Sequence, residues 1–202
     1  MNLGVCIGLN IITLCAVTYC LKLVIPSKKW IGVICMMWIG CFNAPLMSWS
    51  LCAYLYALFD SPSLMLVLLC LYYLARFWLG REGLAFLQQP FFSQSVRYVW
   101  IVLGAFLYFG ALGFVGFDIY HLEFKITIFI LCALSLLCYG LCRLAGFAMI
   151  VCMIAYKAQI LGDMSIWSYY ICPFLWVWCM VVALWQSVYC GFYKDRNGKK
   201  VA

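Results

Sequence analysis

Charged residues are scarce in this chain. Asp, Glu, Lys and Arg make up 9% of its 202 residues, against roughly 25% in an average soluble domain. The sequence has a single histidine, so a haem held by two histidines of the same chain is excluded. It also has no Walker loop, no G-x-S-x-G, no H-E-x-x-H and no dinucleotide fingerprint. The sequence therefore favours a protein that is not an enzyme, and it predicts no cofactor and no metal site.

Apolar residues are abundant instead. They make up 69% of the chain, whereas roughly 45–50% is usual for a soluble domain. The apolar runs are continuous over about 18–30 residues, which fits membrane helices of about 20 residues. A membrane barrel would alternate apolar and polar residues. We therefore expect an all-α integral membrane protein whose residues 1–202 form one polytopic transmembrane domain, with the lipid bilayer as its main solvent.

Polar breaks divide the chain into seven expected spans, a bundle with its N-terminus outside and its C-terminus in the cytoplasm. The first span has no cleavage pattern and no basic region before it, so we expect it to be retained. A segment near 82–96, split by Pro90, mixes apolar and polar residues. It predicts a short amphipathic piece at the inner interface, or else a docking surface for a cytosolic partner. The expected spans are residues 3–25, 30–58, 63–80, 98–117, 125–142, 144–161 and 165–191.

The orientation rests on the basic residues, because Lys and Arg favour the cytoplasmic side. With the C-terminal tail inside, every basic residue except Lys125 and Lys157 falls on the inner side. A rival six-span arrangement merges 125–157 into one helix and buries Arg143. That burial costs at least ~2.5–3.5 kcal/mol, so we favour seven spans. The basic residues are scattered rather than clustered, which argues against nucleic acid as a partner.

The 14 cysteines contain no C-x-x-C pair, and almost all lie inside apolar runs. A thiol there acts as a small apolar side chain that packs well between helices. The short loops favour a bacterial inner membrane as the location.

A first candidate site lies within the long span 30–58, in the stretch "CFNAPLMSWS". Pro45 removes one backbone donor and is expected to kink the helix beside Asn43. The kink has two readings. It is either a packing feature, or part of a substrate or ion pathway at a broken helix.

A second candidate is the outer loop "DIYHLEFK", residues 118–125. His121 as a base oriented by Asp118 or Glu123 would make a catalytic dyad. The simpler reading is a polar turn between two spans. Lys157 and Asp163 near another outer loop would complete a polar outer rim, with Gln159 and Gln186 as further hydrogen-bonding groups.

Three functions remain open from the sequence. The first is a non-enzymatic subunit of a membrane complex, either a homo-oligomer or an assembly with other membrane or cytosolic proteins. Small residues suited to helix packing, namely Gly104, Gly110, Gly113 and Gly116, support it. The second is a small transporter or channel past Asn43, Pro45 and the outer rim. The third is a membrane enzyme acting on a lipid or quinone at the outer face.

Overall fold

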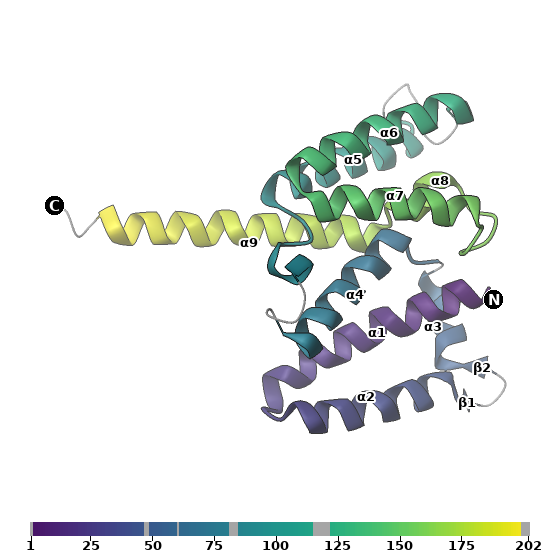
Figure 1. Cartoon of the computed structure of the whole chain (residues 1–202), viewed down its shortest axis with the longest axis vertical. Helices are drawn as coiled ribbons and strands as arrows, with labels where there is room; N and C mark the ends of the chain where they lie inside the picture. Colours follow the sequence, from purple (N-terminus) through teal and green to yellow (C-terminus); the bar gives the residue numbers. More distant parts are fainter. Residues whose placement is uncertain (1, 47–48, 60, 81–84, 115–121, 199–202) are drawn as a thin grey trace. The chain divides into compact units, whose positions relative to one another are not determined.

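The structure, a computed structural model, is about 80% helical, which confirms the predicted helical class. It describes the whole chain apart from residues 1, 47–48, 60, 81–84, 115–121 and 199–202, and it gives no side-chain detail at 46, 58–59, 85–86 and 189–198. Figure 1 shows the elements. They are α1 (Leu3–Val24), α2 (Lys28–Asn43), β1 (Pro45–Leu46), β2 (Trp49–Ser50), α3 (Leu51–Phe59), α4 (Leu64–Leu79), the 3₁₀ helix η1 (Ala85–Gln88), α5 (Gln94–Ala111), α6 (Phe124–Leu141), α7 (Arg143–Lys157), α8 (Ile166–Tyr170) and α9 (Pro173–Gly198).

Two helices, α1 with 22 residues and α6 with 18, are long and apolar enough to cross a bilayer by length and composition. Two shorter apolar stretches are Leu64–Leu79, which is α4, and Pro173–Val188, which is the part of α9 whose side chains the structure describes. At 1.5 Å per residue, a 16-residue helix such as α4 is about 24 Å long, somewhat less than a hydrocarbon core of about 30 Å.

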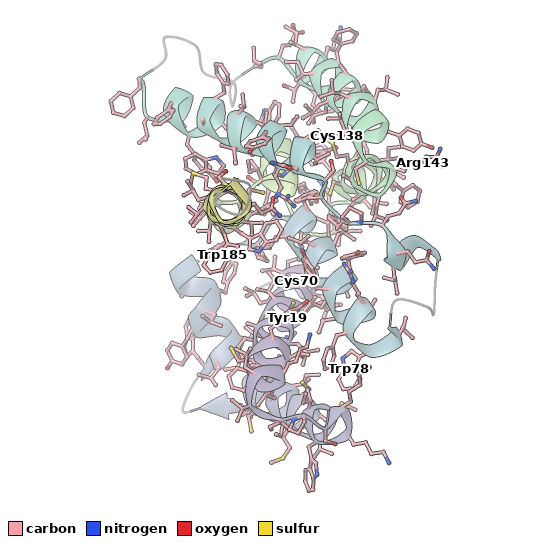
Figure 2. All side chains as sticks on the ribbon, turned by 90° about the vertical axis from the view of Figure 1, so that its left-hand side faces the viewer. Tyr19, Cys70, Trp78, Cys138, Arg143 and Trp185 are labelled. Atoms are coloured by element: carbon pink, nitrogen blue, oxygen red, sulfur yellow. The ribbon has the colours of Figure 1, made fainter. Side chains whose placement is uncertain are left out.

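The described contacts divide the chain into two compact units. Unit 1 comprises residues 1–91 and 147–172, and unit 2 comprises residues 92–146 and 173–202. In unit 1, α1 packs against α2, α3 and α4, and α4 packs against α8. Figure 2 labels Tyr19 on α1 and Cys70 on α4, and the ring of Tyr19 meets that of Tyr73 edge-on at 6.0 Å. The prediction of one membrane domain stays a prediction.

In unit 2, α5 packs against α9 and α6. α5 and α9 come close together at Gly104, where a Cβ atom would lie 2.2 Å from Cδ1 of Trp176. The indole Nε1 of Trp176 donates a hydrogen bond to the carbonyl oxygen of Ile101 at 3.0 Å. Gly104 therefore lets α9 come close to α5 within this chain. Gly113, by contrast, follows the end of α5 with φ +76° and serves a turn rather than a helix face.

The long helix expected over 30–58 is not present. α2 ends at Asn43, and Ala44 is extended with φ −66° and ψ 140°, the region that a residue before proline prefers. Pro45 and Ser50 then pair across the antiparallel ribbon β1–β2, and α3 begins at Leu51. The expectation that Pro45 kinks a continuous helix is therefore wrong, because the helix stops there.

The helix expected over 165–191 is also interrupted. α8 ends at Tyr170, and Pro173 occupies the first position of α9. Proline suits that position because its missing N–H would have no partner inside the helix. Pro173 thus starts a helix here instead of bending one.

The segment near 82–96, expected as a short amphipathic piece at the interface or as a docking surface, is described only in part. Its described part is the short turn η1, two bends and the start of α5. Leu87, Phe91 and Phe92 are buried in the protein, and the hydroxyl of Tyr72 donates to the carbonyl oxygen of Gln89. These apolar side chains pack inward, so they are not available to lie on a lipid surface.

A single residue separates α6 from α7. Cys142 is extended, with φ −159° and ψ 110°, and its N–H caps α6 by bonding the carbonyl oxygen of Cys138 at 2.7 Å. α7 then begins at Arg143. The single long helix of the six-span arrangement is therefore absent, and the turn expected at Arg143 is present.

Candidate functional site

Asn10 of α1 and Asn43 of α2 form a reciprocal amide pair. Nδ2 of Asn43 donates to Oδ1 of Asn10 at 2.7 Å, and Nδ2 of Asn10 donates to Oδ1 of Asn43 at 3.1 Å. The amide of Asn43 also donates to the backbone carbonyl oxygen of Ile39, and the amide of Asn10 donates to that of Cys6. The pair therefore ties α1 to α2 at the point where Pro45 ends α2. An asparagine within the apolar run of α1 is the sequence signal for this partner.

Two thiols adjoin the asparagine pair. Sγ of Cys6 lies 3.8 Å from Oδ1 of Asn43 and 3.6 Å from Sγ of Cys52 on α3. All hydrogen-bonding positions of the Asn43 amide are thus engaged by this network. The described groups form a satisfied polar contact between three helices, so the chemistry visible here is structural rather than catalytic.

The outer loop is only partly described. Asp118 and His121 lie outside the described residues, so the proposed dyad stays a prediction. Glu123 is at the N-cap position of α6, where it is exposed and its side chain makes no capping bond. Its backbone carbonyl accepts from the hydroxyl of Thr127 at 3.3 Å.

Lys157 and Asp163 lie on either side of the turn that follows α7. Lys157 is the last residue of α7 and is exposed. Asp163 accepts a hydrogen bond from Nε2 of Gln159 at 2.7 Å, and Gln159 has the left-handed backbone angle φ 50°. Glu123 belongs to unit 2 whereas Lys157 and Asp163 belong to unit 1. The convergence of these residues into one outer rim stays a prediction.

Gln186 has a hydrogen-bond partner on α5, and its part in an outer rim stays a prediction. Its Oε1 accepts a hydrogen bond from Nη2 of Arg97 at 2.6 Å, between α9 and α5. Arg97 was expected as a loop cation at the inner face, but it lies within the first turns of α5 and is only 9% exposed. Ser93 is the sequence signal that a helix begins before Arg97. Its hydroxyl caps α5 by accepting a hydrogen bond from the N–H of Val96.

Three basic side chains gather at one end of unit 1. The ammonium groups of Lys22 and Lys28 lie 6.0 Å and 5.6 Å from the ring centre of Phe77. Arg76, beside Phe77 on α4, donates to the hydroxyl of Tyr72 at 3.3 Å. Cations over an aromatic face are held by the ring quadrupole. The sequence predicts all three basic residues on the inner side. In the structure, Lys22 and Lys28 lie near the ring of Phe77, and Arg76 precedes Phe77 on α4.

Among the described residues, no three His, Cys, Asp or Glu side chains gather into a group that could hold a metal ion. Comparisons with protein-family models, curated proteins and solved structures find no match to this chain.

Helix α2 has one of the clearest unpartnered faces in unit 1. Ile31, Cys35 and Phe42 are buried on one side of it. The opposite side is exposed at the positions i, i+3, i+4 and i+7 that form one helical stripe. These residues, which we name the outer face of α2, are Val33, Met36, Met37 and Gly40.

Proposed function

We propose that this chain is a polytopic membrane protein of about seven spans and a non-enzymatic subunit of an oligomeric membrane complex. Its partners are further copies of itself or other subunits of the same membrane. The observation that carries the proposal is the outer face of α2. It is an apolar stripe that the described part of the chain leaves uncovered.

The membrane setting is supported by how much apolar surface the helices expose. On α6, Phe129 and Leu136 are each 75% exposed. On α1 the side chain of Leu23 is 88% exposed. Large apolar side chains this exposed on several helices mix poorly with water, and such surface favours contact with lipid or with another protein.

The assembly is supported by the composition of the outer face of α2. A Cβ atom at Gly40 would meet no atom within 4 Å. In lipid, small residues let a second helix backbone approach closely, which is a main source of helix association. Met36 and Met37, 74% and 65% exposed, are flexible side chains that adapt to a partner surface. The stripe therefore suits a packed helix better than it suits fluid acyl chains.

The proposal is tested by comparing Gly40→Leu with Gly140→Leu. Both glycines are exposed helix residues, and a Cβ atom at either meets nothing within 4 Å. Neither change should harm the fold of the single chain, since leucine favours helix more than glycine does. We expect Gly40→Leu to lower the particle mass in mild detergent, because its side chain blocks close approach of a second helix. Gly140→Leu on α6 should leave the mass unchanged.

The measurement is the mass of the purified particle in mild detergent by light scattering or native mass spectrometry. A wild-type particle that contains one copy of this chain and no other protein would contradict the proposal. An assembly of unchanged mass in Gly40→Leu would move the interface away from α2.

A further inference from the structure

The side chain of Arg97 is buried, and among the described residues it has no acidic partner. Its Nη1 donates to the carbonyl oxygen of Phe92 at 3.0 Å, and its Nη2 donates to Oε1 of Gln186 at 2.6 Å. Its Nε is buried and has no hydrogen-bond partner. Both partners that it does have are neutral. Across the described part of the chain, no carboxylate compensates this charge.

A buried guanidinium in such a setting is unfavourable unless something neutralises it. Arginine stays protonated in proteins, so it does not escape the cost by losing its charge. Removing a charge from water is costly, and an uncompensated buried charge is strongly destabilising. Within the described part of the chain the charge of Arg97 thus lacks a counter-ion, which a bound anion would supply.

The position of the guanidinium also favours an anion. Arg97 reaches back to Phe92, the residue before the N-cap Ser93 of α5. The N-terminus of a helix carries partial positive charge and binds phosphate groups readily. One turn further along α5, the indole Nε1 of Trp100 is buried and has no acceptor. Two N–H donors on the same helix are thus left without partners near a positive helix end.

We propose that Arg97 binds the phosphate of an anionic phospholipid. This inference rests on the membrane location in the proposed function. The planar fork of arginine matches the oxygens of a phosphate.

The access side of this site is apolar, which favours a lipid over a soluble anion. Gln186, the partner of Arg97, is exposed. Its neighbours on α9 are exposed apolar residues, Trp185 at 72%, labelled in Figure 2, and Val188 at 55%. Tyr98, which follows Arg97 on α5, is 45% exposed. A phospholipid whose phosphate is held at Arg97 would place its acyl chains along these apolar side chains.

The decisive variant is Gln186→Glu, which keeps the size of the side chain and places a carboxylate beside Nη2 of Arg97. It supplies the missing counter-ion from within the chain. We expect wild-type protein to bind one phosphatidylglycerol at least about tenfold tighter than phosphatidylcholine, as a charge-assisted contact provides. Gln186→Glu should lose that preference and should melt at a higher temperature than wild type when lipid is absent.

The control is Arg143→Gln, which lowers the net charge by the same single unit at an exposed arginine of unit 2. It should keep the preference for phosphatidylglycerol. The measurement is lipid binding by native mass spectrometry of detergent-purified protein, with melting temperature followed in parallel.

Equal binding of the two lipids by wild type, or an unchanged preference in Gln186→Glu, would overturn the assignment. Displacement of phosphatidylglycerol by millimolar inorganic phosphate would show a soluble-anion site instead. Loss of a co-purifying subunit from Gln186→Glu, with lipid preference intact, would assign Arg97 to a partner's carboxylate. Because particle mass is measured separately on Gly40→Leu, failure of this assignment is distinguishable from failure of the proposed assembly.

Discussion

At the scale of single residues, Asn10 and Asn43 each supply the hydrogen bonds that the other needs. Replacing either one by leucine leaves the remaining amide with unsatisfied groups, and we expect a loss of about 1–2 kcal/mol of stability. The double change Asn10→Leu with Asn43→Leu removes both partners and should cost less than the sum of the two single changes.

A double-mutant cycle checks this, with unfolding of the detergent-solubilised protein as the readout. Additive losses would mean that the two amides act independently, and would return Asn43 to its alternative reading as part of a pathway. Coupled losses would assign the pair to holding α1 against α2.

The residue scale also separates what the sequence predicts from what it does not. The sequence predicts an interruption of the helix at Pro45, because proline has no backbone N–H to donate. Whether it bends the helix or ends it depends on Ala44 and on the pairing of Pro45 with Ser50, which no local pattern specifies. Burial of Arg97 was likewise not predicted, because it depends on α9 packing against α5 from about 90 residues further along the chain.

At the scale of elements, the contact between α5 and α9 depends on Gly104. A methyl group there would lie 2.2 Å from Cδ1 and 2.5 Å from Nε1 of Trp176, so Gly104→Ala must displace the indole from its bond to Ile101. We expect a loss of about 1–3 kcal/mol, typical of an overpacked core.

The same measurement on Gly140→Ala should show no loss, because that position is open. Combining Gly104→Ala with Trp176→Leu, which makes room for the methyl group, should shrink the effect of the alanine. An unchanged effect in the combined variant would mean that Trp176 is not the obstacle.

Most element positions follow from the sequence, while the breaks inside two of the expected spans do not. α1, α4, α6 and α7 lie within a few residues of the expected ranges, since each is a single apolar run bounded by polar or turn-forming residues. The expected ranges 30–58 and 165–191 each hold two helices instead of one. Apolar residues continue through both breaks, so hydropathy alone does not register them.

At the scale of the whole molecule, the proposed orientation places the two chain ends on opposite sides of the membrane. It rests on the bias of Lys and Arg toward the cytoplasm. Lys22, Lys28 and Arg76 agree with it locally, because they gather at one end of unit 1.

The orientation is checked with epitope tags at each end, probed by protease in sealed right-side-out vesicles. We expect the N-terminal tag to be cleaved and the C-terminal tag to be protected until the vesicles are opened. Tags cleaved together, or protected together, would require an even number of crossings.

The junction at Cys142 limits where the chain tolerates an insertion. With one residue between α6 and α7, and with Gly146 so close to Tyr139 that a Cβ atom would lie 2.5 Å from its Cα, no slack exists for an insertion. A reporter placed after Cys142 should disrupt folding of the chain, because α7 would no longer follow α6 directly.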